Sequence, residues 1–255
     1  MPDSIYKPET TGRVVTIIQA RMGSERLPGK VLAPILGTPL LALIIKRISS
    51  SRLHGKLVVA TTREAEDDAI EDLMNRLGVS CFRGATEDCL DRFYEAATKY
   101  QAEVVIRLTG DNPLIDYEFL DWVLSQFLAT DPRCDYLFTS STSFPLGLSV
   151  EVFTFSALEI AWKETLNPAL RAHVTPYLRR HPERFRVTNL TGPEDCSQMR
   201  WTVDTPEDLE FVRSIYESFR DRQFFGWREV LGLLRDQPTL LKINQHVQQK
   251  AVEEG

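Results

Sequence analysis

The fold is decided near the start of the chain, by the stretch Val14-Val-Thr-Ile-Ile-Gln-Ala-Arg-Met-Gly-Ser-Glu-Arg-Leu-Pro-Gly-Lys30. Its first five residues are rich in β-branched side chains and are bounded by polar residues, which predicts a buried strand. The remainder predicts a loop in which Gly23 and Gly29 let the backbone approach a ligand closely and point N–H groups toward it. Such a strand and loop are typical of the phosphate sites of α/β proteins, because their ligands bind at the carboxyl ends of strands.

Three cations in the same loop support the phosphate interpretation. Arg21, Arg26 and Lys30 match the charge of a triphosphate, and the arginine fork matches the geometry of its oxygens. We therefore expect this loop to be exposed and to bind a nucleotide. The alternative is a solvated turn in which basic residues merely neighbour glycine, since the loop has neither a G-x-x-x-x-G-K-S/T nor a G-x-G-x-x-G pattern.

The composition is that of an ordinary folded domain. The chain has 255 residues, of which 43% are hydrophobic and 26% are charged, enough for one large domain or one domain with an excursion. Its net charge of −6 argues against nucleic acid as the main partner, because binding a phosphate backbone requires a basic surface. A single nucleotide needs only local cations and remains compatible with this charge.

The N-terminal residues and the cysteines give no indication of secretion or of a zinc site. Residues 1–12 contain one lysine and no apolar core, so we expect a disordered leader rather than a signal peptide. No segment is apolar over the length needed to span a bilayer. The four cysteines are far apart and form no C-x-x-C pair, which argues against a zinc site or a disulfide framework. We therefore expect a cytoplasmic protein that does not bind membranes.

Strand and helix patterns alternate through the first half of the chain. This order predicts an α/β fold with a doubly wound, mostly parallel sheet and right-handed crossovers. We expect residues 13–240 to form a single domain, with a small inserted lobe over about 135–200 and a polar tail over 241–255. The expected strands lie at 14–18, 57–60, 80–82, 104–108, 135–139, 149–154, 186–189 and 200–203. The expected helices lie at 39–48, 67–77, 88–100, 119–129, 156–165, 169–180, 206–219 and 227–235.

Capping residues predict where two of these helices begin. Ser156 is expected to cap the helix that follows it. Thr205 is expected to cap the helix that begins at Pro206, because proline fits a first turn and Glu207 and Asp208 favour its positive end.

Two aspartates follow expected strands that are far apart in the sequence. Asp111 follows the strand 104–108, in Thr109-Gly-Asp-Asn-Pro113, and Asp204 follows the strand 200–203. Mg²⁺ prefers oxygen ligands and combines few protein carboxylates with substrate phosphates. Two carboxylates that converge on a triphosphate therefore predict a Mg²⁺ site. The alternative is that Asp111 starts a turn and Asp204 caps a helix.

Together these motifs resemble a known family. The segments Q-A-R-M-G-S-E-R-L-P-G-K, V-V-A-T-T, R-G-A-T-E-D-C-L-D-R-F, R-L-T-G-D-N-P-L-I-D, H-V-T-P-Y and R-W-T-V-D-T-P-E-D-L occur in this order. The chain resembles the cytidylyltransferases that make CMP-activated acidic sugars. It is most similar to the branch of spore-coat polysaccharide biosynthesis proteins, which is similar to 3-deoxy-manno-octulosonate cytidylyltransferase. The resemblance covers residues 14 to 218 approximately.

The resemblance implies a fold like that of the sugar nucleotidyltransferases, and roles for individual residues. Arg21 and Lys30 would hold the triphosphate of CTP, with Arg26 nearby, and Asp111 and Asp204 match the magnesium-binding pair. We expect Arg21, Lys30 and the two aspartates to carry catalysis. The other positions on the nucleotide side are Ala20, Gly23, Ala60, Thr61, Thr62, Arg83 and Asp88.

The resemblance also implies a reaction and partners. A sugar hydroxyl would attack the α-phosphorus of CTP in line, CMP would pass to an acidic sugar or related polyol, and pyrophosphate would leave, for surface polysaccharide biosynthesis. Such a transfer depends on positioning and on offsetting charge, without a protein nucleophile. The lobe would contact the acceptor and form a homodimer. The alternatives are another NTP–sugar nucleotidyltransferase, a glycosyltransferase, or a diverged non-catalytic nucleotide-binding protein.

Three positions depart from the family pattern in segments expected beside the acceptor. Ser149, Leu170 and Ala172 stand where the most similar branch has acids, in G-L-D-V-E-V and E-R-E-H-V-T. We expect the loss of three negative charges to change which acceptor fits or to lower activity.

The same segments contain the expected acceptor-binding residues, Glu151, Arg171 and His173. Arg171 and His173 form a pair of cations that matches an acceptor carboxylate. The alternative for this pair is a surface helix that faces solvent or a dimer mate.

Overall fold

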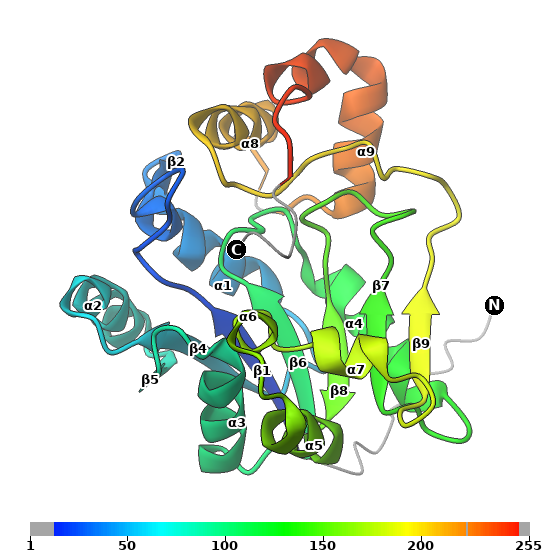
Figure 1. Cartoon of the computed structure of the whole chain (residues 1–255). Helices are drawn as coiled ribbons and strands as arrows, with labels where there is room; N and C mark the ends of the chain where they lie inside the picture. Colours follow the sequence, from blue (N-terminus) through cyan, green and yellow to red (C-terminus); the bar gives the residue numbers. More distant parts are fainter. Residues whose placement is uncertain (1–12, 223, 250–255) are drawn as a thin grey trace.

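The computed structural model describes residues 13–222 and 224–249 (Figure 1). The leader expected over residues 1–12 lies outside the described residues. The core of the protein is a seven-stranded sheet in the order β5-β4-β1-β6-β8-β7-β9. Its strands are β1 (Val14–Gln19), β4 (Lys56–Thr62), β5 (Ser80–Gly84), β6 (Val104–Thr109), β7 (Tyr136–Thr139), β8 (Glu151–Thr154) and β9 (Val187–Leu190).

The sheet is mostly parallel, as the alternating sequence pattern predicts. Strand β1 pairs in parallel with β4 and β6, and Gln19 at its end is level with Ala60 and Thr109. Strand β8 is antiparallel to both of its neighbours, β6 and β7. The three central strands therefore end together at one edge, where the loop after β1 begins.

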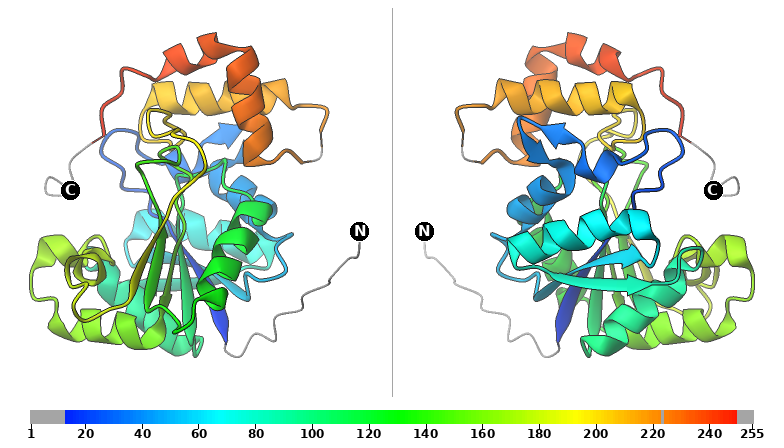
Figure 2. Two further views of the ribbon diagram at one scale, coloured as in Figure 1. Left: turned by 90° about the vertical axis from the view of Figure 1, so that its right-hand side faces the viewer. Right: turned by 90° about the vertical axis from the view of Figure 1, so that its left-hand side faces the viewer.

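Helices cover both faces of the sheet, because β1 sends apolar side chains to each face. Ile18 packs in the core beneath α1 (Leu40–Ile48), α2 (Asp68–Leu77) and α4 (Tyr117–Ala129). Val15 and Ile17 pack in the core beneath α3 (Cys89–Lys99), α5 (Phe155–Glu164) and α7 (Pro176–Arg180). The views in Figure 2 show the sheet between these two layers. The predicted doubly wound α/β fold is confirmed.

The last helices lie beyond the carboxyl ends of the parallel strands, at the top of Figure 1. They are α8 (Pro206–Ser218), α9 (Trp227–Asp236) and the 3₁₀ helix η3 (Pro238–Ile243). Thr205 caps α8 as predicted, since its hydroxyl accepts the N–H of Asp208, whose carboxylate accepts the N–H of Thr205. The short elements not predicted from the sequence are η3 and also η1 (Lys30–Leu32), β2 (Pro34–Ile35), β3 (Thr38–Pro39) and η2 (Ala65–Asp67).

The lobe differs from the prediction in two local features. The helix expected over 169–180 is two short helices, α6 (Pro168–Arg171) and α7, because Val174 has a φ of +67° and Pro176 lacks an N–H. The cap of α5 is Thr154 rather than Ser156, since the Thr154 hydroxyl accepts the N–H of Ala157.

The expected strand at 200–203 is also absent among the described residues. Only Arg200 bridges to Leu146 there, in an isolated contact.

The C-terminal part of the described chain is packed rather than free. Leu241 and Ile243 contact the main core, and the buried Asn244 side chain donates to the carbonyl of Arg200. Residues 241–244, which we expected to belong to the polar tail, are therefore part of the packed domain. Within residues 13–222 and 224–249, every helix is too short or too polar to traverse a lipid bilayer.

Candidate functional site

A cleft of about 550 Å³ opens at the carboxyl ends of β1 and β6. The loop after β1 forms one wall, and helix α6 with the segment before and within the start of α3 forms another. Asp111 and Asp204 face the same cleft, although their segments are far apart in sequence. The predicted site residues that line it are Ala20, Arg21, Arg26, Lys30, Asp111, His173 and Asp204.

Lys30 joins the two aspartates at the floor of the cleft. Its Nζ donates to Asp111 Oδ2 at 2.8 Å, to Asp204 Oδ1 at 2.7 Å and to the carbonyl of Val203 at 2.8 Å. These contacts use all three N–H groups of the ammonium. Segments that are far apart in the sequence thus bring the cation of Lys30 and the carboxylates of Asp111 and Asp204 together at the floor of the cleft.

Local backbone structure places each of these groups. Gly29, with a φ of +72°, reverses the chain so that Lys30 enters the 3₁₀ helix η1 and points inward. Asp111 accepts the hydroxyl of Thr109 at 2.6 Å through Oδ1, and its carbonyl accepts the N–H of Val203 at 2.8 Å. This last bond ties the two aspartate-bearing segments together.

Burial and charge set the ionisation of this cluster. Burial opposes the charge on Lys30, but Asp111 and Asp204 outweigh it and raise the pKa of the ammonium above its ordinary value. Burial likewise opposes the charge on Asp204, while Lys30 and Arg200 hold the pKa of that carboxyl below its ordinary value. Lys30 is only 9% exposed, so the expectation of an exposed loop cation is wrong for this residue.

The donor set fits a divalent cation. The carboxylates of Asp111 and Asp204 and the carbonyl oxygen of Val203 converge on a single point. The ammonium of Lys30 occupies that point. Among the described residues, no group of three or more His, Cys, Asp or Glu side chains has the arrangement of a metal site. A divalent cation at this point would have two protein carboxylates and would complete its shell with water and substrate phosphates.

The two arginines of the loop differ in their surroundings. Arg21 is exposed and lines the cleft. Arg26 forms an ion pair with Asp204 at 2.9 Å and donates to the carbonyl of Gln248 at 3.1 Å. Arg200, which the sequence analysis missed, donates to Asp204 Oδ2 at 2.7 Å. Its position four residues before Asp204 in the R-W-T-V-D motif was the available signal.

The predicted nucleotide-side residues of β4 do not line the cleft. Ala60 and Thr61 are fully buried and Thr62 is 1% exposed. The carbonyl of Ala60 already accepts the N–H of Ala20 at 3.1 Å. These residues support the cleft wall from behind, and their place on the nucleotide side stays a prediction.

Arg83 and Asp88 also have structural surroundings. The Arg83 guanidinium donates to the carbonyls of Thr62 and Glu64 and pairs with acids of α2, outside the cleft lining. Asp88 caps α3 by accepting the N–H of Asp91 at 2.8 Å. Asp88 lies between Glu87 and Cys89, which line the cleft, so nucleotide contact at Arg83 and Asp88 stays a prediction.

Of the expected acceptor residues, His173 lines the cleft, whereas Glu151 and Arg171 do not. Arg171 pairs with Asp88 and donates to the carbonyls of Trp162 and Thr165, so its guanidinium holds the lobe together. The direct acceptor role predicted for Arg171 is not matched by this geometry.

Glu151 is buried under the lobe. Its carboxylate accepts hydrogen bonds from Arg107, Tyr136, Thr175 and Arg179. Burial opposes its charge, but the two arginines hold the pKa of this carboxyl below its ordinary value. Glu151 therefore joins β8 to β6 and α7 and lies outside the cleft lining.

The positions that depart from the family pattern are also separated by the structure. Ala172 lines the cleft and Ser149 is exposed outside its lining. Of these three positions, Ala172 is therefore the one that lines the cleft wall.

One wall of the cleft comes from the segment R-G-A-T-E-D-C-L-D-R-F, of which the sequence analysis selected only Arg83 and Asp88. Thr86, Glu87, Cys89 and Arg92 line it, on the segment that follows β5 and enters α3. The rule that ligands bind after the carboxyl ends of strands applies to this segment as well and could have identified these four residues.

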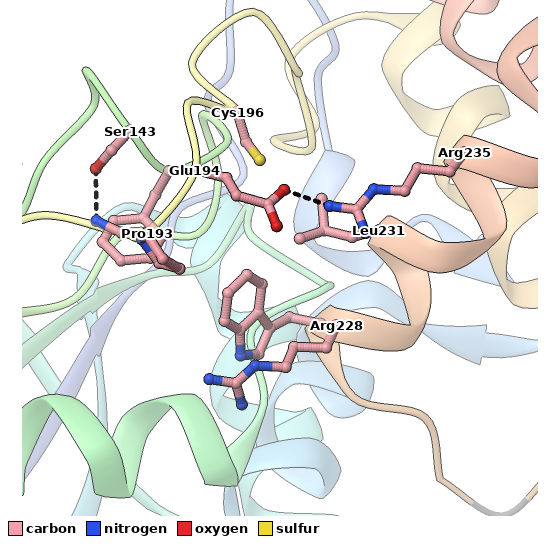
Figure 3. A pocket seen from close by; sticks show the side chains of 10 residues that line it. Ser143, Pro193, Glu194, Cys196, Arg228, Leu231 and Arg235 are labelled. Atoms are coloured by element: carbon pink, nitrogen blue, oxygen red, sulfur yellow. Dashed lines mark hydrogen bonds and ion pairs between the residues drawn. The ribbon is translucent and has the colours of Figure 1, made fainter.

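A second cavity, of about 140 Å³, lies between α9 and the loops that contain Ser143 and Glu194 (Figure 3). Trp227 lines it, and Glu194 pairs with Arg235 beside it. No residue predicted to act on the nucleotide lines this cavity among those described, so the larger cleft is the candidate active site.

Sequence comparisons place the chain among known proteins. The model of the cytidylyltransferase family matches residues 15–246. The spore coat polysaccharide biosynthesis protein SpsF of Bacillus subtilis is 38% identical over 232 residues, which cover 88% of this chain and 95% of that protein.

Solved structures share the fold. A cytidylyltransferase from Leptospira borgpetersenii is 34% identical with a TM-score of 0.86, over 94% of this chain and 99% of that chain. A CMP:2-keto-3-deoxy-manno-octonic acid synthetase complexed with CTP is 19% identical with a TM-score of 0.63, over 81% of this chain and 99% of that chain. The second likeness extends to the fold alone.

Proposed function

Since the chain belongs to the cytidylyltransferase family, and is therefore a nucleotidyltransferase, we propose that it transfers CMP from CTP to an acidic sugar or related polyol. Pyrophosphate is the second product, and the activated sugar serves surface polysaccharide biosynthesis. The observation that carries this proposal is the floor of the cleft, where Lys30 contacts Asp111 and Asp204 together.

The charges around the cleft suit a metal–triphosphate complex. Arg21 is exposed at its rim, and Lys30 lies at the floor. Asp111 and Asp204 are the proposed Mg²⁺ ligands. Held by these two carboxylates, Mg²⁺ would supply positive charge that neutralises phosphate oxygens and lowers the pKa of the attacking hydroxyl.

The reaction we propose is an in-line displacement at the α-phosphorus. The acceptor oxygen forms a bond to phosphorus, the bond to the β-phosphate oxygen breaks, and the hydroxyl proton leaves to solvent. Lys30 exchanges its carboxylate partners for phosphate oxygens when the nucleotide binds, and with Arg21 it offsets the charge of departing pyrophosphate. These residues act by positioning and charge, without a covalent intermediate.

The acceptor is proposed to bind between α6 and the start of α3. Ala172 and His173 line one side of this part of the cleft, and Glu87 and Arg92 line the other. Because Ala172 stands where the most similar branch has an acid, we expect this wall to favour a more anionic acceptor than that of its relatives.

A homodimer and a cytoplasmic location belong to the same proposal. The homodimer follows from the family resemblance, and Leu166 of the lobe, exposed at 87% of its full surface, is the position at which we test an interface. The four described cysteines are free, as expected in a reducing compartment. Light scattering should give a dimer mass that falls by half in Leu166→Glu, and an unchanged dimer mass would contradict an interface at Leu166.

Pyrophosphate release with each NTP and a panel of acidic sugars and polyols tests the reaction. We expect release with CTP alone among the nucleotides, dependent on both a divalent cation and an acceptor. Asp111→Asn should abolish it, whereas the exposed control Asp195→Asn should not. Release with another NTP only would replace CTP in the proposal, and no release under any combination would favour a non-catalytic nucleotide-binding protein.

A further inference from the structure

Asp67 is a fully buried carboxylate behind the loop that follows β1. It is the last residue of η2 and directly precedes α2. Its Oδ1 accepts the backbone N–H of Met22 at 2.7 Å, and its Oδ2 accepts the backbone N–H of Thr62 at 3.1 Å and the Thr62 hydroxyl. One side chain thus joins the loop after β1 to the end of β4.

The donors around Asp67 compensate for its burial. Burying a carboxylate is costly unless hydrogen bonds replace water. The hydroxyl of Thr62 and the N–H groups of Met22 and Thr62 outweigh burial and hold the pKa of Asp67 below its ordinary value. Asp67 is therefore anionic throughout the neutral range and accepts from both segments at once.

Met22 connects Asp67 to the cations of the loop. Its N–H is held by Asp67, while its carbonyl accepts the N–H of Ser24 at 2.8 Å and of Gly29 at 2.9 Å. The orientation of the peptide that joins Arg21 to Met22 is therefore fixed by Asp67. Through Gly29, Met22 also fixes the turn that sends Lys30 to the cleft floor.

From this chain of contacts we infer that Asp67 is a positioning residue for triphosphate binding. Asp67 holds the N–H of the Arg21–Met22 peptide and thereby the position of Arg21. The carbonyl of Met22 then holds the turn at Gly29, which places Lys30. Asp67 itself lies outside the cleft lining. The inference rests on the proposed function, because it assigns the triphosphate as the ligand that these two cations hold.

Asp67→Asn keeps the volume of the side chain and changes only its charge and its hydrogen-bonding groups, so it tests the positioning role alone. An amide has one acceptor oxygen and an NH₂ group, so it faces either Met22 or Thr62 with a donor. We expect Asp67→Asn to weaken CTP binding, measured by calorimetry with Mg²⁺ present, by at least about tenfold. Binding of CMP, which lacks the β- and γ-phosphates, should weaken by less than about threefold.

Asp116→Asn is the matched control. Asp116 is also fully buried, and it accepts two backbone N–H groups, from Phe119 at 2.9 Å and Trp227 at 2.6 Å, away from the cleft lining. Both variants should lower Tm, but Asp116→Asn should leave the CTP affinity within about twofold of the wild-type value at a temperature where it is folded.

The outcomes are distinct for the inference and for the function on which it rests. Wild-type protein that does not bind CTP would overturn the proposed function. Wild-type binding with Asp67→Asn within twofold of it, or equal losses for CTP and CMP, would overturn the positioning role.

Hydrogen exchange keeps the inference testable if Asp67→Asn does not fold. The Met22 amide of the wild-type protein should be protected from hydrogen exchange. Exchange at the rate of an unstructured peptide would refute its hydrogen bond to Asp67. Asp67→Ser, whose single hydroxyl oxygen replaces the two carboxylate oxygens that reach Met22 and Thr62, carries the same expectation of selective CTP loss.

Discussion

Replacing Lys30 with methionine tests the cluster at the floor of the cleft before any substrate is added. Methionine keeps most of the side-chain length but removes the ammonium. Asp111 and Asp204 then face each other and the carbonyl of Val203 without the cation that joins them.

The size of the effect follows from the geometry. Breaking a buried ion pair by removing one partner costs about 3–5 kcal/mol. The Asp111 and Asp204 side chains remain 26% and 17% exposed, and Arg26 and Arg200 still contact Asp204. Water and these arginines reduce the loss, so we expect the free energy of unfolding to fall by about 2–3 kcal/mol. For a domain of this size, that corresponds to a Tm lower by about 5–10 °C.

The effect depends on pH in a direction that the pKa shifts fix. Asp204 has a lowered pKa in the folded protein, so its contribution is complete above the ordinary value of 3.8 and is lost as pH falls through the folded value. Lys30 has a raised pKa, so its contribution is complete below 10.5. The difference in stability between wild type and Lys30→Met should therefore be constant from about pH 5 to 10 and shrink in acid.

Calorimetry or thermal-shift measurement at neutral and acidic pH provides the assay. Lys163→Met is the control, because Lys163 is exposed and its i,i+4 pair with Glu159 contributes little. A Tm of Lys30→Met equal to that of the control at neutral pH would refute the reasoning. A difference that grows as pH falls would refute the assignment to the carboxylates.

Three further predictions concern single residues. Asp204→Asn should lower the rate of pyrophosphate release by about 100-fold or more while CTP retains measurable affinity, whereas Asp195→Asn should leave the rate unchanged; an active Asp204 variant would remove this residue from the metal site. Thr205→Ala removes the hydroxyl that accepts the Asp208 N–H, so calorimetry should show a loss of about 1 kcal/mol, and an unchanged Tm would contradict the capping box. Burial raises the pKa of the Cys81 thiol from 9.0 to about 11, so its alkylation at pH 8, followed by peptide mass spectrometry, should be about 100-fold slower than that of an ordinary thiol, and an equal rate would show that the thiol is not shifted.

Much of the fold was predictable because it depends on local patterns. The β-branched run at 14–18 became β1, and the Thr205-Pro206 start became α8 with its cap. The break between α6 and α7 was missed, although Pro176 gave a signal, because the apolar spacing across 169–180 resembles one helix.

The site was predictable as a set of residue types but not as a set of contacts. Lys30 and Asp204 are 174 positions apart, so only the tertiary structure reveals that the lysine is buried between carboxylates. Arg171 and Glu151 carry suitable charges for an acceptor, but neighbouring groups of the lobe and sheet already bind them. Sequence gives the chemistry of a side chain, whereas its available hydrogen-bonding groups depend on which neighbours the fold supplies.

A crystal structure with CTP and Mn²⁺ tests the central claim most directly, because Mn²⁺ replaces Mg²⁺ and is located by its anomalous scattering. We predict an anomalous peak bound by Asp111 and Asp204, with the triphosphate against Arg21 and Lys30. A peak remote from both aspartates, or a nucleotide bound outside this cleft, would contradict the account.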